Sequence, residues 1–235
     1  MKLMRIINSV LRSPLSKFSL HIIWGLAAGA ILLTLFGKLA SKLLENELIL
    51  FDTSITHFIQ SFASAKLTSF FIGVTQIGSA YFEIALLLVL GWYLLFRLKH
   101  FWETVILVIS LAGGSCLNYL LKSVFQRARP DILHLVEVNG YSFPSGHAMV
   151  STTFYGMIGY LLWLNLRKQG KSSWYVPVLT VFLILAIGLS RIYLGVHYPS
   201  DVLAGYAAGG VWLAACIIAL QSIRFYKGQK YNPNI

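Results

Sequence analysis

Three short polar clusters interrupt an otherwise apolar chain, and the residue types in them are suited to binding and attacking a phosphate group. The clusters occupy residues 122–130, 144–147 and 190–201. Charged side chains within apolar sequence are costly, and they therefore mark functional sites more often than packing positions. Each cluster also has a simpler structural explanation when it is taken alone.

The first cluster pairs two cations at helical spacing. Lys122 lies seven residues before Arg129, close to two turns of an α-helix, so both side chains can point the same way. Pro130 then ends the helix. The guanidinium offers forked donors to phosphate oxygens, and the ammonium acts as a compact charge. The simpler explanation is that these cations reach toward lipid headgroups, and we assign Arg127 to that role.

The second cluster is Pro144-Ser145-Gly146-His147, which directly precedes an apolar run. A helix that begins there presents free N–H groups and the positive end of its dipole, which favours an anion. Gly146 lets the backbone approach a ligand closely, and Ser145 adds a hydroxyl donor. His147 can give a proton to a leaving oxygen near neutral pH. The simpler explanation is a Ser-capped helix with an interfacial His.

The third cluster places a histidine and a carboxylate four residues apart. Pro199 is favoured in a first helical turn, so His197 and Asp201 flank a predicted helix start. An aspartate bonded to one ring nitrogen fixes the tautomer and leaves the other nitrogen free to attack. Arg191 lies six residues before the histidine, across Gly195, and can fold back as a third cation. Alternatively, Asp201 is only a first-turn residue favoured by the helix dipole.

Composition identifies a membrane protein. The chain is 57% hydrophobic and 11% charged, against about 25% charged residues in ordinary globular proteins. Stretches of spanning length predict a single all-α domain over residues 1–235, a bundle of six transmembrane helices. One longer stretch contains Glu83 and is expected to break at Gly78-Ser79. The predicted spans are 18–37, 80–96, 104–121, 148–166, 172–190 and 202–223.

The basic residues indicate how the spans are oriented. With the N-terminus in the cytoplasm, the cytoplasmic ends carry twelve of the 19 Lys and Arg residues and the outer segments carry seven. The positive-inside rule therefore predicts a cell-membrane protein with cytoplasmic N- and C-termini. All three polar clusters then lie at the extracytoplasmic face, where one site can form. We attribute the net charge of +11 to this orientation and not to nucleic-acid binding.

Two further features have simple interpretations. Basic residues precede the first apolar run, as in a signal peptide, but the run is long enough to span and has no clear cleavage site. A retained signal anchor is therefore expected. Cys116 and Cys216 fall inside predicted spans without disulfide or metal spacing, and we interpret both as packing residues.

An additional helix is predicted between the first two spans. Apolar residues recur there at helical spacing: Phe51, Ile55, Phe58, Ile59 and Phe62. The pattern predicts an amphipathic helix at the extracytoplasmic interface, with Asp52 or Thr53 as its N-cap. We expect this helix to cover the bundle edge, and the alternative is a substrate lid. His57, on the polar side, is expected to be solvated.

The three clusters together resemble the signature of the type 2 phosphatidic acid phosphatase superfamily. Its fixed positions are matched in order by Lys122-x6-Arg129-Pro130, Pro144-Ser145-Gly146-His147 and Ser190-Arg191-x5-His197-x3-Asp201. Within that family, the size and layout are most similar to the bacterial phosphatidylglycerophosphatase B type. The resemblance implies a metal-independent hydrolase that needs no cofactor and acts on a lipid phosphate in the bilayer.

The resemblance also implies a role for each residue of the signature. His197 would attack phosphorus to give a phosphohistidine with support from Asp201, and His147 would protonate the leaving oxygen. The remaining positions would hold the phosphoryl oxygens: Lys122, Arg129, Ser145, Gly146 and Arg191. Phosphoryl transfer depends mainly on such positioning and charge stabilisation.

Several functions are compatible with a membrane phosphate site. We expect phosphatidylglycerol phosphate as the substrate, with undecaprenyl diphosphate as the alternative, because either headgroup can enter from the interface while its tails stay in lipid. A non-hydrolytic lipid-phosphate transporter is less well supported, since such proteins often carry repeats and a midplane site. A vanadium haloperoxidase is disfavoured by the predicted spans, because those enzymes are soluble.

Overall fold

The computed structural model describes residues 14–131 and 134–231, and every regular element in those ranges is a helix. The predicted all-α fold is therefore confirmed. Three basic residues on which the expected signal anchor partly depends, Lys2, Arg5 and Arg12, lie outside the described residues, whereas Lys17 lies in the first described helix. The helices are α2 (Pro14–Leu44), α3 (Ile49–Gln60), α4 (Ala65–Ile77), α5 (Ala80–Trp92), the π-helical turn η1 (Tyr93–Arg97), α6 (Phe101–Phe125), α7 (Gly146–Lys168), α8 (Tyr175–Tyr193) and α9 (Pro199–Tyr231).

Five of these helices are long and apolar enough to cross a membrane: α2, α5 together with η1, α6, α8 and α9. The sequence predicts one more span, over 148–166. The helix α7 covers these residues, but it is not among the five helices that are long and apolar enough to cross a membrane. Its first half carries Ser151, Thr152 and Thr153, all buried. α7 can carry these hydroxyl groups because it packs against α6, α8 and α9, so the faces that bear them contact protein.

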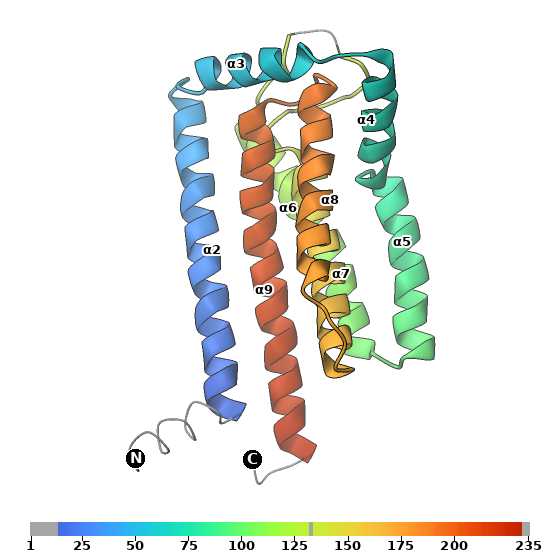
Figure 1. The fold of residues 1–235 in the computed structure, drawn as a ribbon. Helices are drawn as coiled ribbons and strands as arrows, with labels where there is room; N and C mark the ends of the chain where they lie inside the picture. The colour runs from blue at the N-terminus through green and yellow to red at the C-terminus, as the bar shows by residue number, and fades with distance from the viewer. Residues whose placement is uncertain (1–13, 132–133, 232–235) are drawn as a thin grey trace, which may run out of the picture.

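The long helices run side by side, and α3 lies across one end of the bundle (Figure 1). The first turn of α2 and the last turns of α9 lie at the opposite end. The predicted break before the second span is confirmed, since α4 ends at Ile77 and α5 begins at Ala80. The Ser79 hydroxyl accepts a hydrogen bond from the Phe82 N–H and so caps α5.

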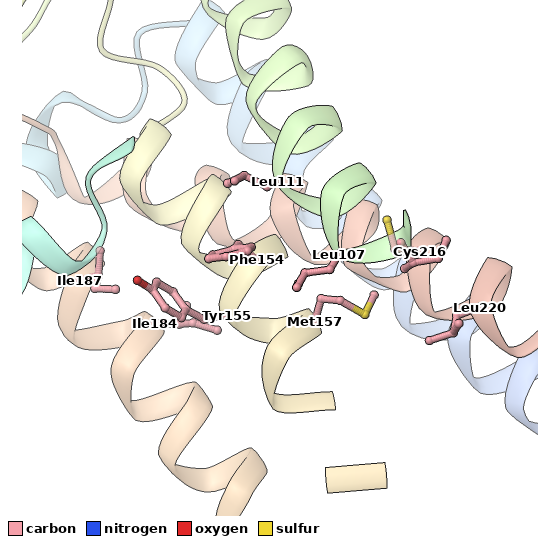
Figure 2. Close-up of a cluster of buried hydrophobic side chains, with 10 residues drawn as sticks. Leu107, Leu111, Phe154, Tyr155, Met157, Ile184, Ile187, Cys216 and Leu220 are labelled. Atoms are coloured by element: carbon pink, nitrogen blue, oxygen red, sulfur yellow. The ribbon is translucent and has the colours of Figure 1, made fainter. Parts of the chain in front are cut away.

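The main hydrophobic core lies between α6, α7, α8 and α9, as Figure 2 shows. Its larger side chains come from facing helices. Five of them have no exposed surface: Leu107, Phe154, Met157, Ile187 and Leu220. Cys216 packs in the same cluster, as predicted, whereas Cys116 is exposed and its interpretation as a packing residue is wrong. Both cysteines are free thiols. This core fixes the four helices whose ends carry the polar clusters.

Small residues let α7 and α9 approach closely. A Cβ added at Gly209 would lie 2.5 Å from the Met149 carbonyl oxygen, and one at Gly205 would lie 2.8 Å from the Ser145 carbonyl oxygen. At the end of this contact, the Ser145 N–H donates to the Asp201 carbonyl oxygen at 3.0 Å. The close packing therefore brings the second and third polar clusters together.

The interfacial helix α3 differs from its prediction in two ways. It begins at Ile49, with Leu48 at the N-cap position, so the assignment of Asp52 or Thr53 as the N-cap is wrong. The polar residues Asp52 and Thr56 face the bundle and are buried. Large apolar side chains on the helix are exposed instead: Ile49, Leu50, Phe51 and Phe58. The predicted exposure of His57 is confirmed.

We expect the Gly209→Ala variant to be destabilised by about 1–3 kcal/mol, because the new methyl group overpacks the α7–α9 contact. The matched control is Gly73→Ala in α4, where an added Cβ meets nothing within 4 Å. Thermal unfolding of both variants in the same detergent measures the effect. Equal melting temperatures would show that the close approach of α7 and α9 does not limit stability.

Candidate active site

His197 lies in the turn between α8 and α9 and is 2% exposed. Gly195 adopts a φ of +77°, a left-handed conformation that favours glycine, and it turns the chain back after α8. The imidazole then has a different partner on each side. Its Nε2 lies 3.4 Å from Nη1 of Arg129, and its Nδ1 faces Ser142 and Asp201.

Ser142 connects the histidine to the carboxylate, a contact that the sequence analysis missed. Its Oγ lies 3.2 Å from His197 Nδ1, nearer than Asp201 Oδ2, which is 3.5 Å from the same nitrogen. The hydroxyl donates its one proton to Asp201 Oδ2, because an ionised carboxylate only accepts. Ser142 can therefore only accept from His197, so Nδ1 carries the ring proton and Nε2 keeps a free lone pair.

Burial lowers the pKa of His197 to about 4, although its hydrogen bond with Asp201 and the charge of Asp201 act to raise it. The nearby cations Lys122 and Arg129 lower it further. The imidazole is therefore neutral near pH 7, with its unprotonated nitrogen directed at a guanidinium. This is the protonation state that a nucleophilic histidine requires.

Arg127 is a half-buried partner of the Asp201 carboxylate, so its assignment to lipid headgroups is wrong. Its Nη1 donates to Asp201 Oδ1 at 2.6 Å and its Nη2 donates to Asp52 Oδ2 at 2.7 Å. The guanidinium carbon also lies 4.1 Å from the centre of the Tyr198 ring. Burial acts to lower the pKa of Arg127, but the two carboxylates outweigh it and raise the pKa. Two buried acids required this cation.

The cations of the first cluster are held by the loop between α6 and α7. Arg129 donates to the carbonyl oxygens of Asn139, Gly140 and Val196 at 3.0, 2.9 and 2.7 Å. The Lys122 ammonium donates to the carbonyl oxygens of Tyr141 and Ser142. α6 ends at Phe125, so Arg129 lies beyond the helix, and the expected helical pairing of Lys122 with Arg129, ended by Pro130, is wrong. The loop instead brings both cations to the carbonyl oxygen of Tyr141.

Residues 145–147 begin α7 as predicted. Ser145 is the N-cap, and its Oγ accepts from the Ala148 N–H at 3.5 Å. A Cβ added at Gly146 would lie 3.0 Å from Asn118 Oδ1, so this position is tightly enclosed. The His147 ring makes no hydrogen bond within the described ranges. The charges of three predicted site residues act on it: Arg191, Arg129 and Lys122.

Arg191 approaches the site from the last turn of α8 and is 4% exposed. Its Nη1 donates to Thr75 Oγ1 of α4 at 2.7 Å, and its buried Nε–H has no partner among the described residues. A buried donor without a partner is rare in native structures and suits a site that receives an anionic oxygen. Arg191 and Arg129 lie near enough for their charges to interact.

The structure thus brings all eight predicted site residues to one end of the bundle. It adds residues from outside the three clusters: Asp52, Thr75, Asn118 and Ser142. Ser142 stands two residues before Pro144, so its proximity to the second cluster was a usable signal. Asp52 and Thr75 carry no signal in sequence, because only the packing of α3 and α4 directs them here. Within the described ranges, no group of three or more His, Cys, Asp or Glu side chains could hold a metal ion.

Comparisons with known proteins agree with this geometry. The family model described as the PAP2 superfamily matches residues 103–224. The phosphatidylglycerophosphatase B of Bacillus subtilis is 34% identical over 137 residues, which cover 58% of this chain and 67% of that protein. An undecaprenyl-diphosphatase of Sulfolobus acidocaldarius is 30% identical over 49% of this chain and 52% of its own length.

A solved structure has a similar fold. The crystal structure of a transmembrane PAP2-type phosphatidylglycerolphosphate phosphatase from Bacillus subtilis superposes with a TM-score of 0.76 at 28% identity. The superposition covers 80% of this chain and 94% of that one. The present chain is therefore a multi-pass membrane protein with a similar fold.

We expect the His197 imidazole to stay neutral, with the proton on Nδ1, from pH 7 down to about 4. Because its pKa in the folded state lies below the ordinary value of 6.5, the unfolded chain binds the extra proton first. The contribution of His197 to stability is therefore present above pH 6.5 and is lost as the pH falls toward 4. ¹⁵N NMR of histidine-labelled protein, assigned with His197→Gln, measures the titration. A midpoint at 6.5 would contradict the buried geometry.

Proposed function

The chain belongs to the PAP2 superfamily of membrane lipid phosphatases, and from this premise we propose that it hydrolyses phosphatidylglycerol phosphate to phosphatidylglycerol and phosphate. One observation carries the proposed chemistry. His197 is neutral, its Nδ1 is held by Ser142 and Asp201, and its Nε2 faces the guanidinium of Arg129. A nucleophile is thereby directed at the place where a phosphate would bind.

The proposed reaction has two steps. His197 Nε2 attacks phosphorus in line, forming an N–P bond as the P–O bond to the lipid breaks, and His147 gives its proton to the departing lipid oxygen. A water molecule then attacks the phosphohistidine and transfers a proton to His147 while the N–P bond breaks. This releases phosphate and restores both histidines. Asp201 stabilises the positive charge on the ring of the intermediate.

The remaining residues of the signature would hold the phosphoryl oxygens. Lys122, Arg129 and Arg191 supply three cations around His147, and the unpaired Nε–H of Arg191 offers a donor without breaking an existing bond. Ser145 and Gly146 contribute the N-terminal end of α7. Arg129 and Lys122 would exchange the carbonyl oxygens of residues 139–142 for phosphate oxygens.

We further propose that α7 also crosses the membrane, which gives six spans in total, and that both termini are cytoplasmic. The active site would then lie at the extracytoplasmic face, with α3 at that interface. The proposal is supported by the distribution of basic residues along the sequence. It is also supported by the position of α3 across one end of the bundle, opposite the start of α2 and the end of α9 (Figure 1).

Undecaprenyl diphosphate is the second candidate substrate, because one similar protein is an undecaprenyl-diphosphatase. The greater identity and coverage of the phosphatidylglycerophosphatase B match favour phosphatidylglycerol phosphate. The same nucleophile can attack the terminal phosphorus of either lipid. A transporter that only binds the headgroup would need no nucleophile or proton donor.

We expect the purified protein to release phosphate faster from phosphatidylglycerol phosphate than from undecaprenyl diphosphate. Phosphate release from each lipid, measured at the same mole fraction in mixed micelles, compares the two. Equal turnover of both lipids, or faster turnover of the diphosphate, would contradict the ranking.

In the same assay, we expect phosphate release to survive EDTA and to fall with orthovanadate, which mimics pentavalent phosphorus. Loss in EDTA with recovery in Mg²⁺ would contradict the metal-independent mechanism.

We expect His197→Ala to abolish phosphate release, because no other group can form the covalent intermediate. His147→Ala should slow turnover by about 10²–10⁴-fold, while a substrate with a good leaving group, such as p-nitrophenyl phosphate, loses much less. Rapid acid-free quenching with ³²P-labelled substrate detects the phosphohistidine. Phosphate release by His197→Ala at the native rate would contradict the covalent route and revive the transporter alternative.

A further inference from the structure

Asp52 of the interfacial helix α3 is joined to the active site by a buried set of polar contacts. The side chain of Asp52 has no exposed surface, and that of Asp201 has none either. Between them lies Arg127, whose Nη2 and Nη1 donate to the two carboxylates at 2.7 and 2.6 Å. Ser200 completes the set, since its N–H and its hydroxyl both donate to Asp52, at 2.9 and 2.6 Å.

The two oxygens of Asp201 have separate tasks. Oδ1 accepts from Arg127. Oδ2 accepts from the Ser142 hydroxyl and from the Tyr198 N–H at 2.9 Å, and it lies 3.5 Å from His197 Nδ1. These donors together fix the plane of the carboxylate, with the guanidinium holding Oδ1 so that Oδ2 faces the histidine.

The charges of this set explain why a second carboxylate is present. Arg127 alone would cancel the charge of Asp201 and weaken its attraction for a positively charged imidazole. With Asp52 included, two carboxylates face one guanidinium, and the group keeps one net negative charge beside His197. Buried charges are screened little by solvent, so this balance is felt at the ring.

We propose that Asp52 is a positioning residue of the active site: it orients and neutralises Arg127, and so leaves the negative charge of Asp201 available to His197. On this view α3 completes the catalytic machinery and does not merely cover the bundle edge. The proposal deepens the proposed function, because it rests on His197 becoming positively charged when it is phosphorylated.

The charge balance makes a test with three variants possible. Asp52→Asn keeps the shape of the side chain and leaves the set with no net charge, while Arg127→Gln leaves two negative charges. The double variant returns the set to one negative charge, as in the native protein. Thr53→Ala is the matched control on α3, because this exposed hydroxyl bonds only to the main chain of its own helix.

We expect Asp52→Asn to lower kcat by about 10–100-fold, with KM changed less than about twofold. Single-turnover experiments should show slower formation of the phosphoenzyme. The double variant should be at least about fivefold more active than Asp52→Asn, and Thr53→Ala should match the native protein. The measurements are phosphate release in micelles and thermal unfolding, which reports the folded fraction of each variant.

Two results of these activity measurements would overturn the proposal. One is native kcat in folded Asp52→Asn, which would leave the residue with a purely structural role. The other is a double variant no more active than Asp52→Asn, which would show that charge balance is not the mechanism.

Orthovanadate affinity, measured by calorimetry, separates this proposal from the proposed function. Vanadate binding to a histidine nitrogen needs no turnover, so Asp52→Asn should bind it about tenfold more weakly even if no lipid phosphate is hydrolysed. If the native protein hydrolyses neither lipid phosphate while Asp52→Asn still weakens vanadate binding, the proposed function fails and the role of Asp52 stands. Equal vanadate affinity in both proteins overturns the role of Asp52.

Discussion

The buried carboxylate of Asp201 is the constraint on which the polar end of this molecule depends. A carboxylate with no exposed surface is tolerated only when hydrogen bonds and a countercharge replace its lost water. Arg127, Ser142 and the Tyr198 N–H meet that requirement. Two of these partners also perform a second task. The serine fixes the tautomer of His197, and the arginine ties α3 to the start of α9.

Close helix packing makes this arrangement possible. Glycines at the α7–α9 contact let the two backbones approach, which is a common device where helices associate in membranes. The approach joins the Ser145 N–H to the Asp201 carbonyl oxygen and so connects the two helix starts. Hydrophobic side chains deeper in the bundle then hold the helices at that separation (Figure 2). The packing of the supporting helices therefore positions the residues of the polar end.

The helix α3 packs its polar face against the bundle, whereas an amphipathic helix of a soluble protein packs its apolar face there. Its buried side presents Asp52 and Thr56 to the bundle, while Leu50 and Phe58 are exposed. In a membrane protein this reversal is favourable, because lipid accepts the apolar face and the bundle supplies partners for the polar one. The periodicity of such a helix is visible in sequence, but the direction in which each face points is not.

The sequence by itself determined the composition, the helical class and the three clusters. Charges within apolar sequence are costly enough to stand out, and the spacing of Lys122, Arg129, His147, His197 and Asp201 is specific. It also located the helix break at Gly78-Ser79, since local capping and turn preferences suffice for that. Most helices extend beyond the predicted spans, by seven residues at the end of α2 and eight at the end of α9, whereas α8 begins three residues after its predicted start. The reason is that main-chain hydrogen bonds continue a helix past the end of an apolar run.

Only the tertiary structure decided which partners these residues have. Arg127 was misassigned because a cation near a predicted membrane surface has a solvated explanation, and nothing local reveals a carboxylate 75 residues away in sequence. Asp52 was misassigned as an N-cap because nothing in the local sequence reveals its distant partner Arg127. The span over 148–166 was predicted by length, yet the buried hydroxyls of α7 make it less apolar than its neighbours. Local sequence specifies residue types and periodicity, whereas the pairing of buried charges depends on how distant helices pack.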